Sequence, residues 1–143
     1  MKLTLSVIKA DVGSIGGHTR PSRAMLSLVH NRMLEARDRG DIIDSFVAYT
    51  GDDIAILTSH KRGTGDSVIH QLAWKAFLEA TGIAQKFGLY GAGQDLLKDA
   101  PAGNIKGAGP AVAEIEFEHN PTKENKTRPA ESFMLFAADK CGP

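Results

Sequence analysis

LTLSVIKAD, at residues 3–11, combines the two features from which the rest of the architecture can be worked out. Its apolar residues alternate with polar ones and include β-branched types, which predicts a strand over residues 3–10. The strand ends in a carboxylate, Asp11. Carboxylate oxygens are the ligands that a hard cation such as Mg²⁺ prefers, so the end of this strand is a candidate position for a metal.

Two other apolar runs also end in carboxylates. Asp52 and Asp53 separate the runs 42–50 and 54–60, and Asp139 closes the run 133–138. Aspartate is a common turn residue after a strand, and that is the simpler interpretation of any one position. Several strand ends that converge on one edge would instead form a site for more than one Mg²⁺ ion, able to hold a phosphate. The combination of positions favours the metal site.

Length and composition are those of one globular domain. The chain has 143 residues, 42% of them hydrophobic, and its 17 basic residues balance its 17 acidic ones. The balance argues against nucleic acid or a membrane surface as partner, and no run approaches the roughly 20 apolar residues of a membrane helix. Cys141 is the only cysteine, which is typical of a reducing compartment. We therefore expect a soluble, cytoplasmic protein.

The remaining elements follow from periodicity and from capping residues. A helix is predicted to begin near Pro21 and to end at Gly40, and the runs 42–50 and 54–60 read as a hairpin. A second helix, capped by Asp66 or Ser67, is predicted up to Gly88, with a stripe made of Ile69, Leu72, Ala73, Ala76, Phe77, Ala80, Ile83, Ala84 and Phe87.

A glycine-rich segment follows the second helix. Residues 88–110 contain six glycines and no periodic pattern, and a loop of that length in a compact domain is more often functional than idle. Residues 111–118 and 133–138 read as strands. The fold class is therefore α/β in the broad sense (α+β), a largely antiparallel sheet with βαββαβ-like order and with helices on one of its faces.

Several polar residues near these strand ends are candidates for chemistry, each with an alternative. His18 follows a glycine-rich turn after Asp11 and is either a metal ligand or a loop residue. Asp52 and Asp53 repel each other, so they would favour either a bound cation or solvent. In the glycine-rich segment, Gln94 and Asp95 could be ligands, although Asp95 also suits a helix cap.

Two further residues could contact a substrate. Tyr90 could donate a hydrogen bond to a sugar hydroxyl or a phosphate, or could simply be half-buried. Lys140 follows Asp139, and an adjacent carboxylate stabilises the charged form of a lysine. That favours phosphate binding over a Schiff-base role. His30, His60, His70 and His119 share no ligand spacing, and we interpret them as structural or exposed.

Taken together, these segments resemble one family over nearly the whole chain. They are SVIKADVGSIGGH at 6–18, GDD at 51–53, GLYGAGQDLL at 88–97, Gly103-Asn104 and ADK at 138–140. The family is the bifunctional fructose-1,6-bisphosphate aldolase/phosphatase of archaea and deep-branching bacteria. The resemblance implies a layered α-β-β-α sandwich, octameric assembly, and gluconeogenic conversion of triose phosphates to fructose 6-phosphate.

The resemblance also implies a set of site residues. The positions that match Mg²⁺ ligands, with Asp52 bridging two ions, are Asp11, His18, Asp52, Asp53, Gln94 and Asp139. The positions that match binding of the sugar bisphosphate are His18, Tyr90, Gly103, Asn104 and Lys140. Several Mg²⁺ ions, fructose 1,6-bisphosphate and dihydroxyacetone phosphate are thus the implied cofactors and substrates, and a homo-oligomer the implied assembly.

The length of the chain departs from the family pattern. Family members are more than twice as long, and their Schiff-base lysine and its tyrosine partner would lie beyond Pro143. We therefore expect residues 1–143 to be the N-terminal portion of such an enzyme, without aldolase activity of its own. Two other functions stay open from the sequence: a non-catalytic module that binds metal or sugar phosphate, and a small regulatory domain with solvated acidic turns.

Overall fold

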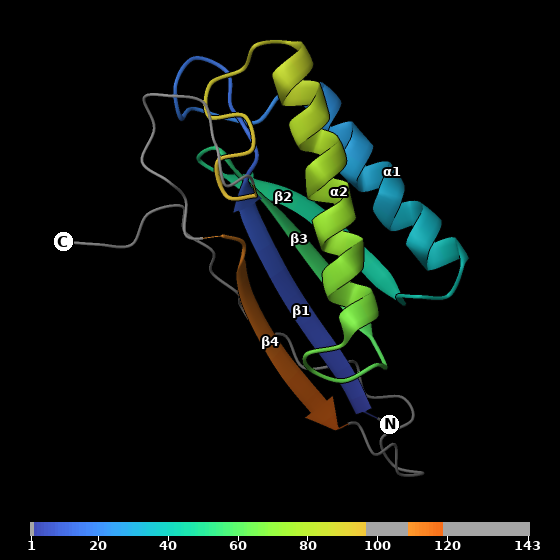
Figure 1. Ribbon diagram of the computed structural model, residues 1–143. Helices are drawn as coiled ribbons and strands as arrows, with labels where there is room; N and C mark the ends of the chain where they lie inside the picture. Colours follow the sequence, from blue (N-terminus) through green and yellow to red (C-terminus); the bar gives the residue numbers. More distant parts are fainter. Residues whose placement is uncertain (1, 97–108, 119–143) are drawn as a thin grey trace, which may run out of the picture.

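The computed structural model describes residues 2–96 and 109–118, which form two helices packed on one face of a sheet (Figure 1). In chain order the elements are β1 (Lys2–Asp11), α1 (Arg23–Asp38), β2 (Asp44–Thr50), β3 (Asp53–His60), α2 (Ser67–Lys86) and β4 (Ala111–Glu118). This order agrees with the prediction. The strand expected at 133–138 lies outside the described residues.

The strands lie in the order β2-β3-β1-β4, and every neighbouring pair is antiparallel. β1 and β2 therefore run parallel with β3 between them, which is the split βαβ arrangement of a ferredoxin-like βαββαβ unit. The predicted α+β class is confirmed. The part of the chain that the structure describes holds one helical layer and one sheet, and the further two layers implied by the resemblance are not in it.

The pairing register fixes which side chains face the helices. β1 and β3 pair from Thr4 opposite His60 to Asp11 opposite Asp53. Because side chains alternate along a strand, Ile8 and Ala10 enter the core beneath the helices, while Asp11 lies on the other face. Asp11 and Asp53, as cross-strand partners, share that face at the end of the pair.

Both helices begin at a side-chain cap and bury a stripe of apolar residues. The Ser22 hydroxyl accepts a hydrogen bond from the Met25 amide, and Asp66 Oδ1 accepts from Val68 and Ile69. The predicted stripe of α2 is correct for most of its members. Phe87 is the exception: it is the C-cap of α2, at the point where the helix ends, and it is 65% exposed.

A polar network stabilises the sheet at the end opposite Asp11. The buried Ser6 hydroxyl donates to Glu114 Oε1 and is also bonded to His60 Nε2, both over 2.8 Å. Glu114 in turn accepts from the Gly65 amide and pairs with His70. His60 and His70 are therefore structural, as predicted, and the network joins β4 to β1 and to the start of α2.

β2 begins at Asp44 rather than at residue 42, and Ile42 instead packs as a buried residue of the core. Within residues 2–96 and 109–118, neither α1 nor α2 has the length and apolarity that a bilayer-crossing helix requires.

Phe77 provides a test of where the core lies. Its side chain is fully buried between α2 and the sheet, while its neighbour Leu78 is 38% exposed. We expect Phe77→Ala to lower the free energy of unfolding by about 3–5 kcal/mol, through lost burial and a cavity. Leu78→Ala should cost less than about 1 kcal/mol. Chemical denaturation measures both, and equal losses would contradict this packing.

Candidate metal centre

The centre forms where β1 ends beside the turn that joins β2 to β3. Asp11 is the last residue of β1, Asp52 lies in the turn, and Asp53 is the first residue of β3. Asp52 is fully buried, and Asp11 and Asp53 are only 5% and 6% exposed. Three carboxylates from distant parts of the sequence thus meet at one edge of the sheet because β1 pairs with β3 in this register.

His18 reaches the carboxylates through a tight turn. Gly16, Gly17 and His18 have positive φ angles of 62°, 68° and 56°. For a residue with a side chain this left-handed conformation costs about 1–3 kcal/mol, and it persists only where the surroundings impose it. Here the His18 amide donates to the Ser14 hydroxyl over 2.9 Å. The strained backbone turns the imidazole toward the end of β1.

Asp11, His18 and Asp52 form a compact group of donor atoms. His18 Nδ1 contacts Asp52 Oδ2 and lies 3.8 Å from Asp11 Oδ2. One nitrogen or oxygen of each residue lies within 4.8 Å of the others. Two carboxylates and an imidazole at this spacing suit a divalent cation. Among residues 2–96 and 109–118, this is the one such group of three.

Gly13 lets the end of β1 pass close beneath the C-terminal part of α2. A Cβ at this position would lie 2.7 Å from the Ala84 Cβ, and the φ angle of 126° is one that other residues rarely adopt. The close approach also places the segment that follows α2 next to the candidate centre. Glycine at position 13 is therefore required by both space and backbone conformation.

The segment after α2 is hydrogen-bonded to the chain that leaves β1. Ser14 and Tyr90 exchange two backbone hydrogen bonds, and the Gly93 amide donates to the Val12 carbonyl. Gln94 follows directly, and its Oε1 atom is buried with no hydrogen-bond partner in the described part of the chain. A buried amide oxygen that lacks a donor is costly, and a cation would satisfy it. The residues present therefore fit a metal.

Tyr90 lies against the imidazole. The two rings meet edge to face with their centroids 4.7 Å apart, and Tyr90 is 44% exposed. The predicted substrate residues His18 and Tyr90 are thus neighbours, although they are far apart in the sequence. The other predicted site residues, Gly103, Asn104, Asp139 and Lys140, lie outside the described residues.

Asp53 lies beside the group of three and is engaged by a lysine. Its Oδ2 forms an ion pair with the Lys9 ammonium. Lys9 was missed in the sequence analysis, although its place two residues before Asp11 puts both side chains on one face of β1. Asp95 Oδ2 accepts a hydrogen bond from the Asp11 amide, a contact that the sequence pattern did not predict.

Burial and neighbouring charge shift the protonation of Asp11. Desolvation is the largest cause, followed by the Asp52 carboxylate, with smaller effects from Asp53 and Asp95, and together they raise the pKa of Asp11 from 3.8 to about 7. A hydrogen bond from the Gly13 amide to Asp11 Oδ1 acts in the opposite direction. The ionised form of Asp11 is therefore unfavourable unless a proton or a cation neutralises the charge.

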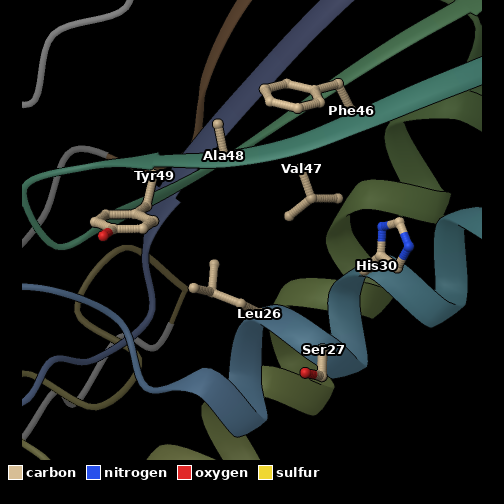
Figure 2. Close-up of a pocket in the computed structure, with 7 residues that line it drawn as sticks. All are labelled: Leu26, Ser27, His30, Phe46, Val47, Ala48 and Tyr49. Atoms are coloured by element: carbon tan, nitrogen blue, oxygen red, sulfur yellow. The ribbon is translucent and has the colours of Figure 1, made fainter.

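A separate hollow lies between α1 and β2 (Figure 2). It has a volume of about 480 Å³, and its lining residues are Leu26, Ser27, His30, Phe46, Val47, Ala48 and Tyr49. In Figure 2, Val47 and Leu26 point toward each other across it, and no carboxylate lines it. The carboxylates gathered at the end of β1 therefore lie outside this hollow.

Comparison with known proteins agrees with this geometry. A model of a protein family described as fructose-1,6-bisphosphatase matches residues 2–143. The chain belongs to the fructose-1,6-bisphosphatase family. The resemblance inferred from the sequence motifs is thereby confirmed.

Similar proteins in this family carry a bifunctional name. The chain is 54% identical over 143 residues to the fructose-1,6-bisphosphate aldolase/phosphatase of Thermus thermophilus, 50% identical to that of Cenarchaeum symbiosum and 51% identical to that of Pyrobaculum neutrophilum. These alignments cover the whole of this chain but 37%, 35% and 34% of the respective relatives. The chain thus spans about a third of the length of its relatives in the fructose-1,6-bisphosphatase family.

The raised pKa of Asp11 predicts a pH-dependent stability in the absence of metal. Because the folded pKa of about 7 exceeds the ordinary 3.8, the stabilising contribution of neutral Asp11 is complete below pH 4 and is lost as the pH rises through 7. We expect the stability of the parent relative to Asp11→Asn to fall over that range, by on the order of 4 kcal/mol.

Denaturant titrations of both proteins in a chelator, at several pH values, measure this difference. Asp44→Asn, at an exposed carboxylate, is the matched control and should follow the parent. Adding Mg²⁺ should abolish the loss in the parent. A stability difference between parent and Asp11→Asn that does not change with pH would contradict the assignment of Asp11.

Proposed function

We propose that this protein carries the phosphatase chemistry of its family: Mg²⁺-dependent hydrolysis of fructose 1,6-bisphosphate, in gluconeogenesis. One observation supports this above all others. Asp11, His18 and Asp52, which come from three separate segments, gather their donor atoms within 4.8 Å in a chain that the fructose-1,6-bisphosphatase model matches over residues 2–143. The similar proteins named as aldolase/phosphatases make fructose 1,6-bisphosphate the candidate substrate.

Asp11, His18 and Asp52 would hold the first ion. Asp53 lies beside this group, and Gln94 lies in the segment that is hydrogen-bonded to the end of β1. By the resemblance these two residues and Asp139 would complete the ligands, with Asp52 shared between two ions. When bound, Mg²⁺ would neutralise phosphate oxygens and supply a polarised water for attack on phosphorus. The choice of Mg²⁺ rests on the ligands, which are mainly oxygens.

The side chains of this group would bind the ion and orient the substrate phosphate. Burial keeps the Asp11 and Asp52 carboxylates in a weakly polar medium, where their attraction for a cation is stronger than at the surface. The imidazole of His18 faces these carboxylates, yet 36% of its side chain is exposed. With Tyr90 packed against it, His18 can contact both an ion and a substrate phosphate. By the resemblance, Gly103, Asn104 and Lys140 would complete the phosphate contacts.

We further propose that residues 1–143 alone do not catalyse condensation of dihydroxyacetone phosphate with glyceraldehyde 3-phosphate. The lysine and tyrosine that the resemblance assigns to that reaction match no position in this sequence. We also propose a cytoplasmic homo-oligomer, an octamer by the resemblance. Exposed apolar side chains on the sheet, such as Phe46 at 65% and Ile115 at 47%, support association.

Asp52→Asn tests the proposed function. Asp52 lies in the group and is fully buried. Removing a residue that only supports a metal ligand typically weakens binding by about 10–100-fold, so we expect the loss of Asp52, a proposed ligand, to weaken Mg²⁺ binding by more than about 100-fold. Mg²⁺-dependent release of phosphate from fructose 1,6-bisphosphate should fall in parallel. Stability in a chelator should hold or rise, since one of several adjacent negative charges is removed.

Asp44→Asn serves as the matched control and should keep both properties. If the parent releases no phosphate while Mg²⁺ still raises its melting temperature, the non-catalytic binding module replaces the phosphatase. If neither Mg²⁺ nor fructose 1,6-bisphosphate shifts melting, the regulatory domain replaces both. Equal Mg²⁺ affinity in Asp52→Asn and parent would contradict the metal assignment.

A further inference from the structure

Asp95 forms two hydrogen bonds with the backbone of Asp11. Its Oδ2 atom accepts from the Asp11 amide over 2.8 Å, and its own amide donates to the Asp11 carbonyl over 3.2 Å. The side chain and the main chain of one residue thus hold both polar backbone groups of the candidate ligand. This arrangement resembles one more step of strand pairing.

The position of this contact explains why a side chain is needed there. β4 pairs with β1 only as far as Lys9, which lies opposite Ala111. Beyond that point β4 no longer supplies partners for β1, and Asp95 bonds the backbone of Asp11 instead. A backbone amide and carbonyl left without partners in this buried place would each cost free energy, and movement of the strand end would follow.

The same contact fixes the segment that follows α2. Gly93 is bonded to Val12 and Tyr90 to Ser14, so Asp95 completes a row of contacts along the end of β1. Gln94, with its buried amide oxygen, lies between the bonded residues 93 and 95. Asp95 therefore restrains two predicted ligands. It bonds the backbone of Asp11 directly, and it fixes the segment after α2 in which Gln94 is the preceding residue.

We propose that Asp95 is a positioning residue of the metal centre, which holds Asp11 and Gln94 in place through its hydrogen bond to the Asp11 amide without itself ligating the ion. The inference rests on the proposed function, because it assigns Asp95 a role in that same site. What matters in this role is an acceptor oxygen at the Oδ2 position, and the negative charge is secondary.

Two substitutions separate the acceptor from the charge. Asp95→Asn keeps an acceptor oxygen and loses the charge, whereas Asp95→Ala loses both. By calorimetric titration with Mg²⁺, we expect Asp95→Ala to bind about 10–100-fold more weakly than the parent and Asp95→Asn to stay within about threefold. Asp95→Asn as weak as Asp95→Ala would overturn the proposal in favour of a charge or ligand role. Parent-like binding by Asp95→Ala would also overturn it.

Asp66→Ala is the matched control for a loss of stability alone. Asp66 also accepts backbone hydrogen bonds, as the N-cap of α2, but it lies away from the centre. Its substitution should lower the melting temperature and leave Mg²⁺ affinity unchanged. If Asp66→Ala weakened Mg²⁺ binding as much as Asp95→Ala, global destabilisation would account for both, and the proposal would fail.

Hydrogen exchange at the Asp11 amide gives a readout that needs no metal. Protection should be high in the parent and in Asp95→Asn, and lost in Asp95→Ala. Equal protection in all three would overturn the proposal whatever the Mg²⁺ results. If the parent binds no Mg²⁺ but shows this pattern, the proposed function fails, while the anchoring of Asp11 by Asp95 stands as a structural fact.

Discussion

The antiparallel pairing of β1 with β3 is the constraint on which the candidate centre depends. It places Asp11 opposite Asp53 and brings the turn that contains Asp52 to the end of β1. A shift of one residue in this register would move Asp11 to the helix-covered face and Ala10 out of the core. The buried residues Ile8, Ile54 and Ile56 oppose any such shift. The packing of the core therefore determines the geometry of the charges.

The same geometry makes the centre electrostatically unfavourable without a cation. Two carboxylates that are nearly or fully buried, Asp11 and Asp52, lie close together, and the pKa of Asp11 rises to about 7 as a result. Lys9 compensates part of the charge through its ion pair with Asp53, and His18 contacts Asp52. Groups kept against the stability of the fold cluster at functional sites, which supports the proposed metal site. The left-handed backbone at His18, which also costs stability, supports the proposed metal site in the same way.

Sequence periodicity predicted the order of the elements, the single helical face and the antiparallel sheet, because alternation and capping act locally. The recurrence of carboxylates at strand ends predicted that Asp11 and Asp52 meet at one edge of the sheet. The place of His18 beside them was implied by the resemblance, because a single histidine after a glycine-rich turn could equally be a loop residue. Lys9 and the role of Asp95 were not predicted, because each depends on which residue lies across a gap between distant segments. The exposure of Phe87 was missed because periodicity does not show where a helix ends.

Anomalous diffraction from crystals of this protein grown with Mn²⁺, as a substitute for Mg²⁺, tests the central claim most directly. The account predicts one strong peak among His18 Nδ1 and the carboxylates of Asp11 and Asp52, at the ligand distances of about 2.1 Å typical of such sites. Soaking with excess Mg²⁺ should remove the peak. The lack of a peak among these three residues, with the contact between His18 and Asp52 intact, would contradict it.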